Sequence, residues 1–280
     1  MKRSIWALMP LYLWTLMLVV LPIGYVIAIS FMTPNITHGV DTVFSTESYR
    51  ALIAPVNLKI IWASLQLGFW TTLLTLLIGY PFAYAMTKQP KKRRNLILLL
   101  VIVPFWTSAL LRVYGWMILL RSNGAINGIL MDLHLIGSPV KFLYNNGAVL
   151  FGMVYSLLPF MILPLYAALD KLDAHIIEAS RDLGANGIKS FATITLPLTV
   201  PGIVSGCLLV FVPSVGLFFI SDLMGGGQSM LLGNLISHYL QMGKNWPLGA
   251  ALSMVMMVLT FLTMALYRKY SGESGLGVIS

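Results

Sequence analysis

Six long apolar segments constrain this chain more than any other feature of its sequence. A helix needs about 20 mostly apolar residues to cross the roughly 30 Å hydrocarbon core of a membrane, and each segment reaches that length. They run approximately over residues 5–31, 60–86, 96–120, 148–169, 199–221 and 248–267. Only 10% of the 280 residues are charged, whereas soluble domains carry roughly 25%. We therefore predict an all-α integral membrane protein with six transmembrane helices in a single domain, residues 1–280.

The basic residues are distributed unevenly between the two sides of this topology. One side, which includes both termini, holds twelve of them: Lys2, Arg3, Lys88, Lys91, Lys92, Arg93, Arg94, Lys171, Arg181, Lys189, Arg268 and Lys269. The other side holds five: Arg50, Lys59, Arg121, Lys141 and Lys244. Because cytoplasmic loops carry the excess of Lys and Arg, both termini are predicted to be cytoplasmic. The net charge of +9 then reflects topology and anionic lipid headgroups, and indicates no nucleic-acid partner.

A polar, charged stretch separates the fourth and fifth segments: EASRDLGANGIKSFATITLP, residues 178–197. Asp173 can cap a helix before it, and Gly184 can end that helix because glycine adopts the left-handed terminus without a Cβ penalty. The second half is predicted to be another helical piece, with Pro197 marking the start of the next membrane helix. Charged and exposed apolar side chains together suit docking into a groove on another protein, and a structural connector is the alternative.

The spacing of particular residues within this stretch favours docking on another protein over a structural connector. Glu-Ala-Ser at 178–180, a glycine after three residues, and Ile-x-Leu-Pro after nine more resemble the Glu-Ala-Ala loop of importer-type ATP-binding cassette permeases. Ser180 replaces the second alanine of that pattern, which is a small-for-small change on a helix. The residues assigned to the loop are Glu178, Ala179, Ser180, Asp182, Gly184, Ile194, Leu196 and Pro197.

The resemblance implies a coupling loop over about residues 170–197, whose first helix seats in a cleft of a cytoplasmic ATPase subunit. Glu178 and Asp182 would pair with basic groups there, and Gly184 would permit the close turn. No Gly-x4-Gly-Lys-[Ser/Thr] loop occurs in the chain. The chain is therefore predicted to be a transport subunit and not an enzyme, with no cofactor of its own and with ATP and Mg bound by the partner ATPase.

Three further runs resemble the spermidine/putrescine importer permeases, and most of all their B-type subunit. They are VPFWTSALLRVYGWMILL (103–120), FVPSVGLFFISDLMGG (211–226) and NWPLGAALS (245–253). Leu217 stands where some of these permeases carry Glu, so this position is not assigned to cation binding. The resemblance implies a type I importer architecture in the bacterial inner membrane. The implied partners are a second, C-type permease, an ATPase dimer and a periplasmic polyamine-binding protein.

A polyamine is a long apolar chain with several ammonium groups, so its path is expected to offer carboxylates and aromatic faces. Asp222, at the outward boundary of the fifth segment, is the best candidate for meeting the cation; a solvated helix-end carboxylate is the alternative. The third segment carries Phe105, Trp106, Tyr114 and Trp116. Trp106 and Tyr114 are the favoured pathway pair, and anchoring at the membrane interface is the alternative reading.

Arg112 is the only charged residue inside the third segment. In a continuous helix it would lie sixteen residues along, about 24 Å from the start and near the outer interface. An intramembrane arginine is costly and usually paired, and a cation would repel a polyamine. We therefore expect a structural role, with a carboxylate of this chain or of the partner permease as its counter-ion.

Two other functions remain as alternatives. One is an importer subunit for a different small solute, which would share the coupling loop. The other is a secondary transporter, but such proteins place ionisable residues near the bilayer midplane, and the six segments hold no Asp or Glu apart from Asp222 at a boundary. The four histidines and Cys207 have no metal-ligand spacing, so no metal site is predicted.

Overall fold

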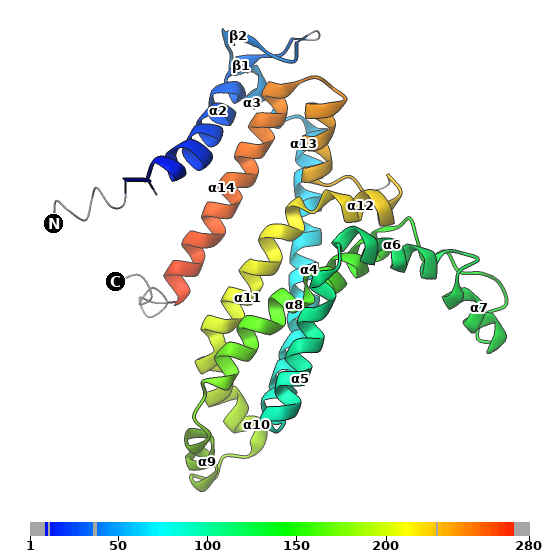
Figure 1. The fold of residues 1–280 in the computed structure, drawn as a ribbon, viewed down its shortest axis with the longest axis vertical. Coiled ribbons are helices and arrows are strands. Elements are labelled where there is room, and N and C mark those ends of the chain that lie inside the picture. The colour runs from blue at the N-terminus through cyan, green and yellow to red at the C-terminus, as the bar shows by residue number, and fades with distance from the viewer. Residues whose placement is uncertain (1–8, 11, 36–37, 228, 272–280) are drawn as a thin grey trace. The chain divides into compact units, whose positions relative to one another are not determined.

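The computed structural model describes residues 9–10, 12–35, 38–227 and 229–271, so the predicted inward residues Lys2 and Arg3 lie outside the described residues. The chain divides into two compact units. Unit 1 comprises Met1–Trp62 and Leu232–Leu259, and unit 2 comprises Ala63–Leu231 and Thr260–Ser280. Figure 1 shows the elements of each unit in chain order, from blue to red.

Helices long and apolar enough to cross a membrane recur along the described chain. Five pass this test singly: Tyr12–Ser30, α4 (Pro55–Thr87), α8 (Asn146–Asp170), Gly187–Gly216 and Trp246–Ala265, which belongs to α14 (Trp246–Ser271). A bent pair, Lys91–Trp106 with Ala109–Asp132, makes a sixth if it counts as one span. The six predicted segments each correspond to one of these, and the first corresponds to Tyr12–Ser30 within the described residues.

The third segment, approximately 96–120, corresponds to the bent pair and is not one continuous helix. α5 (Lys91–Ile102) runs into a 3-10 turn, η2 (Val103–Trp106), and the stretch Ala109–Asp132, which begins with α6 (Ala109–Leu120), lies at 93° to Lys91–Trp106. Thr107 is extended, with φ −94° and ψ 152°, and this interrupts the helical hydrogen bonds. Pro104 contributes because it lacks an N–H donor. The depth expected for Arg112 on an unbroken helix therefore does not apply.

The fifth segment begins earlier than predicted. α10 (Gly187–Ser190), the π-helical turn η3 (Phe191–Thr195) and α11 (Leu196–Gly216) form one span, in which Pro197 lies in the first turn of α11 as predicted. The N–H of Leu196 donates to the carbonyl of Phe191, five residues back. This wider turn accommodates the missing N–H of Pro197. The helix ends at Gly216, and α12 (Phe218–Gly225) follows.

α8 is the centre of unit 2. It packs along α11, and side chains on its two halves belong to two hydrophobic clusters. The first cluster joins α8 to α6 and α12 through residues such as Val149, Val113 and Ile220. Figure 1 shows α8 and α11 lying side by side, and Gly202 of α11 permits their close approach. A Cβ at Gly202 would come within 2.4 Å of the Cβ of Ala168 on α8.

Unit 1 contains the N-terminal span, with the π-turn η1 (Leu16–Val20) and α2 (Leu21–Ser30), and a small hairpin that the sequence analysis did not predict. Its strands β1 (Met32–Thr33) and β2 (Asp41–Phe44) are antiparallel and precede α3 (Glu47–Leu52). The amide of Asn35 donates to both carboxylate oxygens of Asp41 at 2.9 Å. The short helix α13 (Leu232–Gln241) also belongs to unit 1 and buries its first four residues.

Candidate coupling and transport site

The polar stretch after α8 folds as a helix, a sharp turn and a second helix, as the sequence predicts. α9 (Ala174–Asp182) begins at Asp173, whose carboxylate accepts a hydrogen bond from the backbone N–H of His175 at 3.0 Å. Gly184 has φ +84°, the left-handed conformation expected there. Its N–H donates to the carbonyl of Arg181 at 2.8 Å. Local capping chemistry therefore fixes the direction in which the chain leaves α9.

A buried pair of hydroxyls joins the two halves of this loop. The Oγ of Ser180 lies 2.7 Å from the Oγ of Ser190 in α10, and it donates to the carbonyl of Ile177 at 2.7 Å. Ser180 has one hydroxyl hydrogen, so Ser190 supplies the hydrogen for the bond between them. The sequence analysis treated Ser180 as a neutral replacement of alanine. It missed this contact because a partner ten residues away leaves no local pattern.

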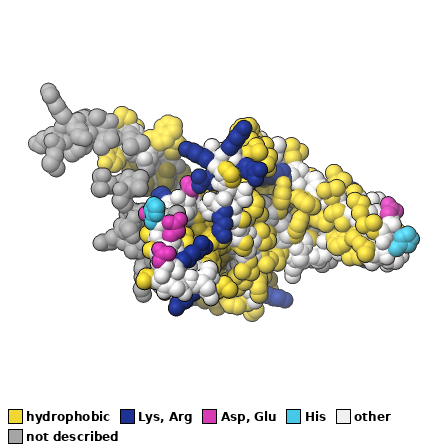
Figure 2. All heavy atoms as spheres, turned by 90° about the horizontal axis from the view of Figure 1, so that it is seen from below, with side chains coloured by type: hydrophobic (Ala, Val, Ile, Leu, Met, Phe, Trp, Pro, Cys, Tyr) yellow, Lys and Arg dark blue, Asp and Glu magenta, His cyan; other side chains and the backbone are white. Residues whose placement is uncertain are grey.

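The opposite side of the loop is exposed and mixed in character. Leu183 is 89% exposed and Ile188 82% exposed, and Ile176 is half-exposed. Glu178 is also exposed and lies 3.5 Å from the imidazole of His175. In Figure 2 the end of unit 2 that carries α9 shows clustered Lys and Arg side chains with acidic groups beside them. Large apolar side chains without cover beside charged groups are typical of a protein–protein docking surface.

Removing either hydroxyl of the Ser180–Ser190 pair should loosen the loop. Ser180→Ala or Ser190→Ala leaves a buried hydroxyl or carbonyl without its partner, at a cost of about 1 kcal/mol. We expect trypsin to cleave after Arg181 or Lys189 about fivefold faster in membrane vesicles that expose this loop. The double variant should lose less stability than the two single variants lose together, because both changes remove the same hydrogen bond. Ser205→Ala, whose hydroxyl bonds the carbonyl of Pro201 outside the loop, is the control. Equal cleavage rates in all four proteins would show that the pair does not hold the loop.

The aromatic candidates of the third segment do not gather in one place. Phe105 packs edge-on against Phe160, and Trp116 packs against Phe151 and Tyr155. Within the described chain, no ring contact joins any two of the four candidates. Both packed rings are partly buried and contact the rings of α8.

Trp106 and Tyr114 remain as exposed aromatic faces. Trp106 is 80% exposed and lies in η2, beside the break between α5 and α6. Tyr114 is half-exposed and lies on α6. Asp222 is exposed on α12, which packs against α6 and α8 in the same unit.

Arg112 stabilises the break between α5 and α6. Its guanidinium donates to the backbone carbonyls of Pro104 and of Thr107, the second at 2.7 Å, and lies 4.9 Å above the ring centre of Phe105. These carbonyls end the first part of the bent span, where helical carbonyls lose their partners and attract a cation. Among the described residues the partners are therefore carbonyls and an aromatic ring, whereas the sequence analysis expected a carboxylate.

Replacing Arg112 by methionine should destabilise the folded chain. The apolar stem is kept, but the carbonyls of Pro104 and Thr107 lose a charged donor, which costs about 1–3 kcal/mol. We expect a lower thermal midpoint for the purified protein in detergent. Lys59→Met, which removes an exposed cation elsewhere, should leave the midpoint unchanged. A midpoint for Arg112→Met equal to that of the control would contradict this role.

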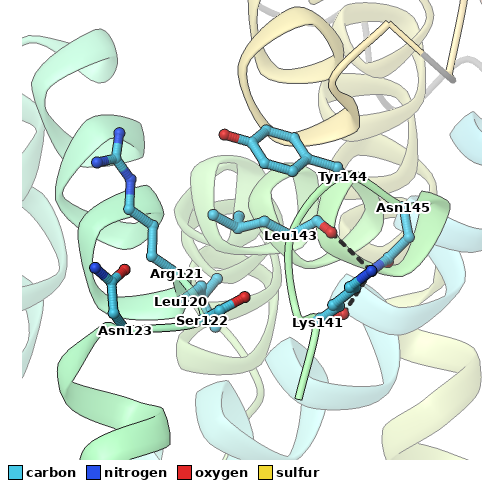
Figure 3. Close-up of a pocket in the computed structure, with 8 residues that line it drawn as sticks. All are labelled: Leu120, Arg121, Ser122, Asn123, Lys141, Leu143, Tyr144 and Asn145. Carbon is cyan, nitrogen blue, oxygen red and sulfur yellow. Dashed lines mark hydrogen bonds between the residues drawn. The ribbon is translucent and has the colours of Figure 1, made fainter. Parts of the chain in front are cut away.

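A pocket of about 640 Å³ lies where α6 ends and α8 begins. Leu120 and Leu143 form its apolar part. Its polar lining consists of Arg121, Ser122, Asn123, Lys141, Tyr144 and Asn145. Figure 3 shows Arg121 and Asn123 on one side and Tyr144 on the other, with Lys141 and Asn145 beside the start of α8. The sequence analysis assigned no function to these residues.

Similarity to known proteins shows which family this chain belongs to. A family model described as binding-protein-dependent transport system inner membrane component matches residues 75–271. The chain belongs to this family. The match covers the 170–197 loop, the bent span and the pocket. The chain is therefore a permease, the membrane-spanning subunit of an importer, and not an enzyme.

Individual relatives are similar in sequence to this permease along most of its length. The spermidine/putrescine transport system permease protein PotB of Haemophilus influenzae is 42% identical over 257 residues, which is 92% of this chain and 90% of that protein. PotB of Escherichia coli is 42% identical over 258 residues, which is 92% of this chain and 94% of that protein. The resemblance to spermidine/putrescine permeases is thus confirmed.

A solved structure supports the fold of the permease. A chain of the bacterial alginate ABC transporter, in complex with an alginate pentasaccharide-bound periplasmic protein, superposes with a TM-score of 0.78. It is 16% identical, with 96% of this chain and 95% of that chain covered. The expected importer-permease architecture is confirmed by this match.

Proposed function

We propose that this permease is the B-type subunit of an ATP-driven polyamine importer and forms half of its translocation path. The observation that carries the proposal is the 42% identity to spermidine/putrescine permeases over 92% of the chain. The other half of the path would come from a C-type permease. An ATPase dimer, binding ATP and Mg, and a periplasmic polyamine-binding protein would complete the complex.

The proposed topology follows from the basic residues of unit 2. Lys88, Lys171 and Lys189 lie at the end of the unit that carries α9, where an ion pair between Arg94 and Asp170 joins α5 to α8. The positive-inside rule makes this end cytoplasmic, in a bacterial inner membrane and with both chain termini on the same side. The exposed face of α9 would then meet the ATPase, with Glu178 and Asp182 pairing with basic groups of that subunit.

The transport path is proposed to use the exposed aromatic faces of the bent span. Trp106 and Tyr114 present ring faces that attract ammonium groups through the ring quadrupole. Asp222 would supply a carboxylate on the outward side of the same unit. The substrate's apolar segments need no polar partner, so alternating ring faces and a carboxylate match its chemistry. Nucleotide-driven motion of the ATPase would open this path alternately to the two sides.

Uptake of labelled spermidine tests the proposed substrate class. The complete importer is expressed in cells that lack polyamine transport, and unlabelled putrescine, sulfate or an amino acid competes. We expect competition by putrescine alone, since only it presents ammonium groups along an apolar chain. An assembled, ATP-hydrolysing complex that takes up no spermidine would reject the polyamine assignment and keep the permease.

A further inference from the structure

Two cations, Arg121 and Lys141, line the pocket between α6 and α8 from opposite sides (Figure 3). Arg121 follows the last residue of α6, and Lys141 precedes the start of α8 by five residues. Both side chains line the pocket, and neither forms an ion pair with a carboxylate of the described residues. Both side chains are exposed, so both charges are accessible to an anionic group of a partner.

A buried asparagine holds the two basic segments together. Asn127 of α7 (Ala125–Asp132) is 1% exposed. Its amide donates to the carbonyl of Arg121 at 3.1 Å and to the carbonyl of Val140 at 3.0 Å. Its Oδ1 accepts from the N–H of Val140 at 2.9 Å. One side chain thus fixes the backbone of Arg121 and of the residue before Lys141, so the two segments that carry the cations are held together.

The far wall of the pocket is also fixed. Tyr144 has φ +62°, an unfavourable conformation for a tyrosine, and its N–H donates to the carbonyl of Met224 at 2.8 Å. Gly226 lies so close that a Cβ there would come within 2.5 Å of the Tyr144 ring. Backbone strain maintained by several contacts is common at binding sites. The phenol of Tyr144 is therefore presented to the pocket as a hydrogen-bond donor opposite Arg121, as Figure 3 shows.

We propose that this pocket receives a carboxylate side chain of the extracytoplasmic binding protein. A guanidinium, an ammonium and a phenol are donors that match a carboxylate, and arginine binds it through two parallel hydrogen bonds. The same charges repel a polyamine, so the pocket is not a substrate site. It lies at the first residue of α8, whereas the coupling loop follows the last residue, about 37 Å away along this 25-residue helix. With the loop cytoplasmic, as the proposed function has it, the pocket faces the binding protein that the family requires.

The test measures how the binding protein stimulates ATP hydrolysis by the whole transporter, reconstituted in lipid nanodiscs. Arg121→Glu and Lys141→Glu should each raise the concentration of binding protein needed for half-maximal stimulation at least tenfold at 50 mM salt. The effect should shrink at 500 mM salt, because salt screens the attraction. Lys59→Glu makes the same charge change on another outward residue, outside the pocket, and should stay within twofold of the wild type. Arg121→Gln and Lys141→Gln provide milder variants if the reversed ones fail to assemble.

A second set of variants identifies the partner group. Each exposed Asp or Glu of the binding protein is replaced by Lys, and one of these replacements should restore stimulation of the Arg121→Glu transporter. Half-maximal concentrations within twofold of the wild type for all pocket variants would overturn the proposal. So would an effect that disappears in nanodiscs of phosphatidylcholine alone, since that result assigns the pocket to an anionic lipid phosphate. If the binding protein stimulates ATP hydrolysis but no spermidine is taken up, the polyamine assignment of the proposed function is rejected and the docking proposal stands.

Discussion

Replacing Glu178 by arginine should reduce spermidine uptake at least tenfold while the permease still inserts and assembles. Glu178 is exposed on α9, and its ion-pair contact to His175 is between two exposed side chains. Such pairs contribute about 0–1 kcal/mol, so the fold should tolerate the change. At the ATPase the same change places a cation against the basic groups expected there, and an uncompensated charge in an interface costs about 2–5 kcal/mol. Uptake and ATPase stimulation are measured on the same reconstituted complex.

The control for this experiment reverses an acid that is equally exposed but lies outside the loop. Glu47→Arg changes the net charge by the same amount in α3 of unit 1, and uptake should remain within twofold of the wild type. A Glu178→Arg complex that retains full uptake would mean that α9 does not dock through this face. Loss of assembly together with loss of uptake would show that Glu178 is needed for folding and contradict the exposed geometry.

Adding side-chain volume at Gly202 should have the largest effect on stability. A Cβ would meet Ala168 at 2.4 Å and the carbonyl of Pro164 at 3.0 Å, so α8 and α11 must separate. Overpacking of this kind costs about 1–3 kcal/mol for Gly202→Ala and more for Gly202→Leu. We expect a lowered thermal midpoint for the first variant and little folded protein for the second. Both are measured on purified protein in detergent.

Two further variants, Gly115→Ala and Ala168→Gly, serve as controls for Gly202→Ala. A Cβ at Gly115 of α6 would meet no other atom within 4 Å, so Gly115→Ala should leave the midpoint unchanged or raise it. Ala168→Gly removes the closest contact and should restore part of the stability of Gly202→Ala. Equal stability of the two alanine variants would show that the helices do not approach as closely as the structure has them.

Features that depend on neighbouring residues were predictable from the sequence. The apolar segments follow from composition over about 20 residues, and the ends of α9 follow from Asp173 and Gly184. The break at Thr107 was not predictable, because the residues around it remain apolar and Pro104 is tolerated within other membrane helices. Likewise, the Ser180–Ser190 pair and the contacts of Asn127 join residues that are far apart in the sequence. Their chemistry emerges only when the chain folds, so the pocket was missed entirely.

The π-helical turn before Pro197 has a mechanical consequence. Because the turn accommodates Pro197, Gly187–Gly216 is one 30-residue helical span of about 45 Å, with Pro201 and Pro213 inside it. Over that length, tilting the end near Gly187 by about 5° displaces the end near Gly216 by roughly 4 Å. A small push on the loop is thereby amplified at the opposite end of the span, where Leu217 leaves the helical conformation and α12 begins.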